Sequence, residues 1–359
     1  FLRVVEHRLQ IPRLLRTAVI PQLDDRRRRL ARAVYSTGDR TTARLDRALA
    51  DVRRRVRSYH EQIFYRPVLD AASSDTVLTS LTAADARDRL SAFGYRDPRA
   101  ALTHIQALTS GVSRAAVIHR QVLPAMLDWL AEGVDPDAGL LAFRRLGESL
   151  RDSSWYLRLL RDSGSAVHSL AAVLSASAYA TSLLQHVPNA VAWIDDDTAL
   201  EPRSRDSLAR EARTLVARHG AQALQPLRAL HGREVLRTAL ADVLRQPGVA
   251  ATASALSRAA DVYLDALVAA LRRGMDGDDV PAYEFAVIAM GRLGGAEIGY
   301  FSDADVMFAY RPLAADGGTG EPTSESASTL AAHVKRLALA LTKEASRSDP
   351  LPGIVVDSD

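Results

Sequence analysis

Asp303 and Asp305 lie one residue apart, directly before the apolar run Val306–Tyr310. Alternate side chains of a strand point to the same face, so both carboxylates are expected on one face. Two negative charges this close repel each other unless a cation lies between them. The spacing therefore predicts a divalent metal site, and the alternative interpretation is a solvated entrance to the strand.

The neighbouring segments predict a small sheet around these aspartates. Phe285–Met290 is a short apolar strand, and Gly294-Gly295 makes a turn that can approach a ligand closely because neither residue has a Cβ. After a loop rich in Pro, Gly and Ser, a helix is expected over residues 328–345. Gly353–Asp357 then reads as a third strand that ends in a carboxylate.

Other chemistries that use paired aspartates or phosphate loops fit less well. A haloacid-dehalogenase-type phosphatase needs its apolar run before the aspartates, whereas residues 299–302 make a poor strand. The sequence also lacks the glycine and distal glutamate of an EF-hand, and it has no Gly-x-x-x-x-Gly-Lys-Ser/Thr loop. Four histidines lie scattered on helical segments without ligand spacing, and each is expected to be a surface or interhelical residue: His104, His119, His168 and His186.

Composition limits the class of protein. The 359 residues are 47% apolar, which suffices for more than one core, and they include no cysteine. Neither a signal peptide nor an apolar run of membrane-spanning length is evident, so we expect a cytoplasmic protein with no membrane partner. Both ends of the sequence are interpreted as cuts through a larger protein.

Charge is unevenly distributed. The formal net charge is +3, but residues 1–66 carry 17 arginines against 7 acidic residues, which leaves −7 for the remainder. A basic helical segment can bind nucleic acid. We instead expect an interface or a solvated face and no nucleic-acid partner, because no aromatic-studded groove motif accompanies the arginines.

Most of the chain before residue 280 reads as helix. An apolar stripe runs from Leu45 to Ile63, and that helix is expected to end near Tyr65 because Pro67 follows. Asp97-Pro98 and Asp135-Pro136 each read as an N-cap followed by proline at the first helical position. Further helical patterns cover residues 155–160, 166–174, 178–184, 207–218 and 253–271.

The stretch GRLGGAEIGYFSDADVMFAY at residues 291–310 carries a family resemblance. A glycine turn, an Asp-x-Asp strand and a further strand ending in Asp are similar to the DNA polymerase β-like nucleotidyltransferases. The stretch itself closely resembles the nucleotide-binding signature of the glutamine synthetase adenylyltransferase family. FLRVVEHRLQ at residues 1–10, HEQIFYRPVLD at 60–70 and the helical region at 101–146 resemble that family in the same order. The arginine- and alanine-rich composition suggests an actinobacterial member.

This resemblance implies a domain plan. Residues 1–72 would be the helical end of the adenylyl-removing half, 73–278 an all-helical domain, and 279–359 the first part of a truncated nucleotidyltransferase core. The implied fold is mostly α, with helical bundles followed by a small mixed sheet in an α+β core. The adenylyl-removing core would precede Phe1.

The resemblance also implies site residues. Asp303 and Asp305 match the metal-binding aspartates, and Asp357 matches the third carboxylate. Gly294 and Gly295 match the turn that approaches the nucleotide phosphates. Ser302 is a weaker candidate for a phosphate or metal contact, and its alternative role is to satisfy backbone groups. No role follows for three further residues: Arg292, Glu297 and Asp359.

The implied activity is transfer of AMP from ATP to a tyrosine hydroxyl of glutamine synthetase, with Mg²⁺ as cofactor. Glutamine synthetase and the PII signal protein are the implied partners. Two alternatives remain open from the residues alone. One is a helical regulatory module that binds these partners, and the other is a nucleotidyltransferase that acts on nucleic acid.

Overall fold

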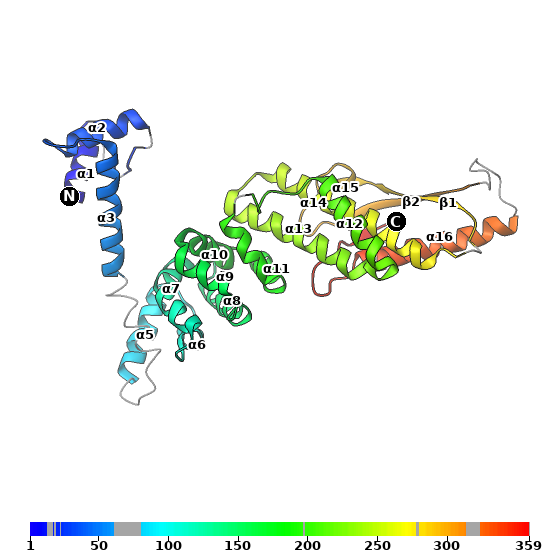
Figure 1. Cartoon of the computed structure of the whole chain (residues 1–359), viewed down its shortest axis with the longest axis horizontal. Helices are drawn as coiled ribbons and strands as arrows, with labels where there is room; N and C mark the ends of the chain where they lie inside the picture. The colour runs from blue at the N-terminus through cyan, green and yellow to red at the C-terminus, as the bar shows by residue number, and fades with distance from the viewer. Residues whose placement is uncertain are drawn as a thin grey trace. The chain divides into compact units, whose positions relative to one another are not determined.

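A computed structural model describes residues 1–12, 17, 19–21, 23–60, 80–196, 198–277, 280–313 and 324–358 (Figure 1). The chain divides into two compact units, Phe1–Ala86 and Arg87–Asp359. The predicted boundaries after residues 72 and 278 fall outside the described residues, so the three-domain plan stays a prediction.

The described residues of the first unit up to His60 form α1 (Leu2–Gln10), α2 (Asp24–Val34) and α3 (Thr42–His60). They share a small core in which Leu45 and Leu49 of α3 pack with apolar side chains of the other two helices. The predicted stripe on α3 is therefore buried at its start, whereas Val56 and Tyr59 are exposed. The predicted end of this helix near Tyr65 lies outside the described residues.

The helix α5 (Ser80–Ala92) crosses the boundary between the units, and a run of helices follows. The helices are α6 (Pro98–Thr109), α7 (Arg114–Ala131), α8 (Pro136–Ser149), α9 (Ser154–Asp162), α10 (Gly164–Ala176) and α11 (Ala178–His186). Asp97 caps α6 and Asp135 caps α8, as predicted: the Asp97 carboxylate accepts hydrogen bonds from Arg99 N and Ala100 N, and Asp135 accepts one from Ala138 N.

Short 3-10 helices, labelled η, and longer α-helices then lead to the sheet. They are η3 (Pro188–Asp195), α12 (Arg205–His219), η4 (Gly220–Ala223), α13 (Leu224–Arg245) and α14 (Val249–Met275). α14 packs against α12 and α13 on one side and against α16 (Ser324–Ala345) of the sheet region on another (Figure 1). This helix therefore joins the helical region to the sheet.

The sheet has three described strands in the order β1 (Tyr283–Ala289), β2 (Ala304–Pro312) and β3 (Val356–Asp357). β1 and β2 are antiparallel, and β2 and β3 are parallel. A single helical turn, α15 (Gly291–Gly294), follows β1. The predicted fold class, mostly α with a small mixed sheet, is confirmed.

The two faces of the sheet differ in burial. One face carries Tyr283 of β1 and Val306 of β2, both buried beside the helices. Because side chains alternate along a strand, Asp305, Met307 and Ile288 belong to the opposite face, where Met307 and Ile288 are exposed. The carboxylates therefore belong to the more open face.

Among the described helices, none is by itself both long and apolar enough to cross a membrane. Only the pair α10 and α11, whose members are bent by 115° to each other, reaches that length and composition together.

Candidate functional site

The three aspartates predicted from the sequence converge at one end of the sheet. Asp303 directly precedes β2, Asp305 is its second residue, and Asp357 is the last residue of β3. The parallel register pairs Asp305 with Asp357. One ligand oxygen from each of the three carboxylates lies within 4.8 Å of the others. Among the described residues, this is the one group of three or more acidic or histidine side chains close enough to share a metal ion.

The donor set suits a hard divalent cation. Carboxylate oxygens are the ligands that Mg²⁺ prefers, and oxygens bound to one octahedral Mg²⁺ are about 3–4 Å apart. Small side-chain rotations would bring the present spacing into that range. Asp303 and Asp357 are exposed and Asp305 is half-buried, so an ion and its remaining water ligands have access.

Gly291 forms part of this site, although sequence reasoning placed the critical turn at Gly294-Gly295. A Cβ on Gly291 would come closer than 3.0 Å to Oδ2 of Asp305, and the backbone here has φ +47°, a left-handed conformation that favours glycine. Met290 N, one residue earlier, donates to the Asp305 carbonyl oxygen at 2.8 Å. Gly291 therefore leaves room for the Asp305 carboxylate.

The two glycines singled out from the sequence have different surroundings. A Cβ on Gly294 would lie 2.7 Å from the Ala289 carbonyl oxygen, so this glycine permits close packing of α15 on the end of β1. Gly295 has ordinary backbone dihedrals, and its Cβ would meet nothing within 3.4 Å. The left-handed residue of the turn is instead Ala296, with φ +57°. Such conformations concentrate at functional sites.

Ser302 takes part in a local turn. Its Oγ accepts a hydrogen bond from Gly299 N at 2.9 Å, which is the backbone role that the sequence analysis gave as its alternative. The hydroxyl proton remains available for donation, so a phosphate or metal contact stays a prediction. Arg292 lies in α15 and Glu297 shortly after it; both are exposed without an assigned role, and Asp359 lies outside the described residues.

Apolar side chains border the carboxylates. Phe301 is 85% exposed and Val355 is 60% exposed, and each lies two residues before a site aspartate. Both line a pocket that Ser302 and Tyr179 of α11 also line, and the Phe301 and Tyr179 ring centroids are 5.0 Å apart. A flat, partly apolar group can pack in this pocket.

The helical histidines are engaged elsewhere, in agreement with the sequence analysis. His119 is buried edge-on to Phe143, and His168 packs edge-on to Trp129. A ring nitrogen of His104 lies 3.1 Å from Arg144, and one of His186 lies 2.8 Å from the Ser182 carbonyl oxygen.

Comparison with known proteins identifies the family. The family model for glutamate-ammonia ligase adenylyltransferase matches residues 167–348. The chain belongs to this family. The match includes Asp303 and Asp305 and ends before Asp357, so the third carboxylate is added by the geometry of the sheet.

Relatives in the glutamate-ammonia ligase adenylyltransferase family are named "bifunctional glutamine synthetase adenylyltransferase/adenylyl-removing enzyme". The protein of Leifsonia xyli subsp. xyli is 43% identical over 347 residues, which cover 94% of this chain and 34% of the relative. That of Streptomyces avermitilis is 41% identical over 358 residues, covering 94% and 35%, and that of Cutibacterium acnes is 43% identical over 323 residues, covering 89% and 32%. The chain thus spans about a third of the length of these relatives.

Proposed function

We propose that this chain contributes the adenylyl-transferring site of a longer enzyme that moves AMP from ATP to a tyrosine hydroxyl of glutamine synthetase. The observation that carries this proposal is the convergence of Asp303, Asp305 and Asp357 on one edge of the sheet. The names of the relatives support the choice of nucleotide transfer and of acceptor. On the resemblance alone, the PII signal protein is proposed as a further partner of the helical region.

The proposed chemistry is attack of the tyrosine oxygen on the α-phosphorus of ATP, with cleavage of the bond to pyrophosphate. Asp303, Asp305 and Asp357 would hold Mg²⁺, which supplies neutralisation of the charge on the phosphates. A tyrosine hydroxyl has a pKa of about 10 and keeps its proton at neutral pH, so Asp357 is also proposed to accept that proton as the bond forms. Gly294, Gly295 and Ser302 are proposed to lie along those phosphates.

The acceptor side of the proposal uses the apolar border of the site. Phe301 and Val355 are exposed beside the carboxylates, and exposed apolar side chains grouped at a site are typical of a surface that binds a partner. We infer that they pack against the acceptor tyrosine ring or its neighbours. The hydroxyl would then reach the α-phosphorus between the ring and the three aspartates.

The test is Asp305→Asn in the full-length enzyme, with adenylylation and deadenylylation assayed separately. Adenylylation should fall at least 10²–10³-fold, on the order expected for loss of one charge-stabilising group, while deadenylylation is retained because it uses another site. Glu284→Gln is the matched control, since Glu284 lies on the same sheet face but pairs with Arg311 at 2.5 Å. Equal loss of both activities would contradict the proposal.

A further inference from the structure

Asp357 is the last residue of β3 that the structure describes. β3 pairs with β2 at only two residues, Val356 opposite Ala304 and Asp357 opposite Asp305. Apart from this register, Ala304 N donates to the Val355 carbonyl oxygen at 2.7 Å. The segment that leads into β3 therefore also contributes to the placement of the third carboxylate.

That segment, residues 346–355, is folded tightly against the end of α16. Ile354 N donates to the Ala345 carbonyl oxygen at 2.8 Å, and a Cβ on Gly353 would come closer than 3.0 Å to the carbonyl oxygens of Ala345 and Arg347. Leu351 and Ile354 are each 6% exposed. The connection is thus anchored at Leu351 and Ile354, whereas residues 347–350 are exposed.

The helix α13 holds the middle of this connection through two adjacent residues. A Cβ on Gly232 would lie 2.7 Å from Leu351 Cβ, so only glycine allows Leu351 to pack this close to the helix. Nδ1 of His231 lies 3.2 Å from the Pro352 carbonyl oxygen. A ring nitrogen that faces a carbonyl oxygen must be the donor, so this nitrogen carries the proton.

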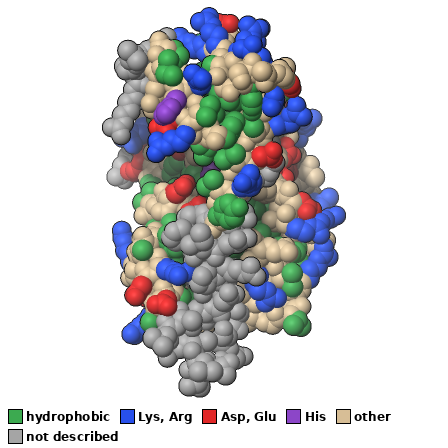
Figure 2. All heavy atoms as spheres, turned by 90° about the vertical axis from the view of Figure 1, so that its left-hand side faces the viewer, with side chains coloured by type: hydrophobic (Ala, Val, Ile, Leu, Met, Phe, Trp, Pro, Cys, Tyr) green, Lys and Arg blue, Asp and Glu red, His purple; other side chains and the backbone are tan. Residues whose placement is uncertain are grey.

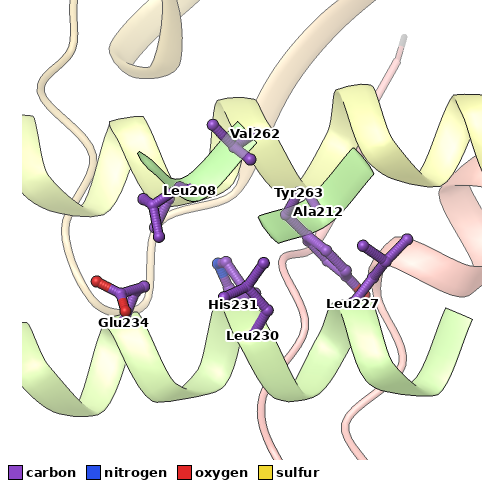
Figure 3. Close-up of a pocket in the computed structure, with 9 residues that line it drawn as sticks. Leu208, Ala212, Leu227, Leu230, His231, Glu234, Val262 and Tyr263 are labelled. Carbon is purple, nitrogen blue, oxygen red and sulfur yellow. The ribbon is translucent and has the colours of Figure 1, made fainter. Parts of the chain in front are cut away.

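The ring of His231 is itself held in place. It stacks on Tyr263 of α14 with ring centroids 4.7 Å apart and an interplanar angle of 18°. Figure 3 shows His231 pointing from α13 into the space toward α14, together with Leu208 and Val262. This space is about large enough for one water molecule.

A buried ion pair fixes the end of α16 from the same helix. Arg228, one turn before His231, lies 3.2 Å from the Glu344 carboxylate, and their side chains are 7% and 14% exposed. The Tyr263 hydroxyl donates to the Glu344 carbonyl oxygen at 3.4 Å. One buried face of α13 therefore contacts both the end of α16 and the middle of the segment that leads into β3.

We propose that α13 positions the third carboxylate, with His231 and Gly232 as the positioning residues that set Asp357 opposite Asp305. The inference rests on the proposed divalent-ion site. Neither residue would touch the ion, the nucleotide or the acceptor. His231 and Gly232 act through Leu351 and Pro352. Replacing either positioning residue should therefore weaken binding of the ion while the chain still folds.

The test is titration of the chain with Mn²⁺ as a spectroscopic substitute for Mg²⁺. His231→Leu removes the donor to Pro352 and should weaken Mn²⁺ binding about tenfold or more, the usual effect of losing a group that orients a metal ligand. His231→Asn can place an amide N–H near the position of Nδ1 and should recover most of that loss. His119→Leu is the matched control, because His119 is equally buried but lies on α7, and this variant should bind Mn²⁺ as the original chain does.

Hydrogen exchange at residues 355–357 provides a second readout that does not depend on the metal. Exchange should be faster in His231→Leu than in His119→Leu. If His231→Leu does not fold, Gly232→Ala serves in its place. Unchanged Mn²⁺ affinity and unchanged exchange would overturn the inference, and so would an equal loss in the His119→Leu control. If Asp357→Asn leaves Mn²⁺ binding intact, the proposed ion site is wrong. The hydrogen-exchange result would still test whether His231 positions residues 355–357.

Discussion

At the scale of single residues, Gly291 shows how one missing side chain shapes the site. The Asp305 carboxylate occupies the space that a Cβ on Gly291 would need. We expect Gly291→Ala to weaken Mn²⁺ binding at least tenfold, because the new methyl group displaces a proposed ligand. The left-handed backbone adds a stability cost of about 1–3 kcal/mol. Mn²⁺ titration and urea unfolding measure the two effects.

The control for this substitution is Gly164→Ala. Gly164 begins α10 with ordinary dihedrals, and no atom lies within 4 Å of the position that its Cβ would take. This variant should keep both Mn²⁺ affinity and stability. If Gly291→Ala keeps full Mn²⁺ affinity, the Asp305 carboxylate does not need the space beside Gly291 to bind the ion.

Buried histidines make the stability of the second unit sensitive to acid. Burial lowers the pKa of His119 to about 4, as it does for His231. The unfolded chain has histidines with a pKa of about 6.5, so between pH 6.5 and 4 it binds more protons than the folded chain. Stability is therefore fully present above pH 6.5 and falls as the pH drops toward 4.

Replacement of His119 should reduce the loss of unfolding free energy that occurs as the pH falls. A shift of this size corresponds to roughly 3 kcal/mol for a fully buried group. We expect His119→Leu to lose less stability between pH 7 and pH 4.5 than the original chain, as measured by urea unfolding at both pH values. Parallel losses in the two proteins would mean that His119 does not titrate in this range.

At the scale of elements, local sequence signals predicted the helix starts well. Asp97-Pro98 and Asp135-Pro136 begin helices as expected, because the capping carboxylate and the proline at the next position act within a few residues. The helical patterns of residues 154–186 were equally clear. These features need no distant partner.

The cap at Asp97 leads to a stability prediction. Asp97→Ala should lower the free energy of unfolding by about 1 kcal/mol, because two backbone N–H groups lose their acceptor. Asp152→Ala is the control, since the Asp152 side chain is 96% exposed and its nearest cation is 3.9 Å away. A loss of similar size in both variants would argue against the cap.

Elements that depend on distant contacts escaped the sequence analysis. α13 was not singled out because its buried face carries Arg228, His231 and Glu234, and these polar residues interrupt the apolar periodicity. The arginine-rich α2 was missed because few of its residues are apolar. β3 is shorter than the predicted strand from Gly353, since that residue packs against the end of α16.

The candidate site also contains residues that local patterns predict and one that depends on a distant contact. Asp303, Asp305 and Asp357 could be predicted because strand alternation and strand order place them together. The contribution of Gly291 could not, because it depends on where Asp305 lies in space and not on any local pattern.

At the scale of the whole molecule, the basic first unit raises the question of nucleic acid. Several of its arginines have local partners, including Arg27 with Asp46 at 2.7 Å and Arg29 with Asp25 at 2.5 Å. On the face seen in Figure 2, basic side chains are interspersed with acidic and apolar ones. Exposed apolar side chains such as Leu2 and Ile11 also favour a protein interface.

We therefore expect no specific nucleic-acid binding by this chain. A titration with labelled single-stranded and duplex DNA, at near-physiological salt, should show no sub-micromolar binding. Phosphate binding by arginines would weaken steeply as salt is added. Tight DNA binding that is lost as salt is added would support the alternative in which the first unit binds nucleic acid, and not the one in which it forms a protein interface.

The contacts between α13 and the segment before β3 have a consequence for the order of folding. His231 and Pro352 are 121 residues apart in sequence, and Arg228 and Glu344 are 116 apart. Closing so long a loop costs chain entropy before any contact between its ends forms, and contacts between distant residues slow folding. The helices are expected to form first, and the third aspartate should reach its place in one of the last steps. A chain that has just regained its helical content would then still be unable to bind the ion.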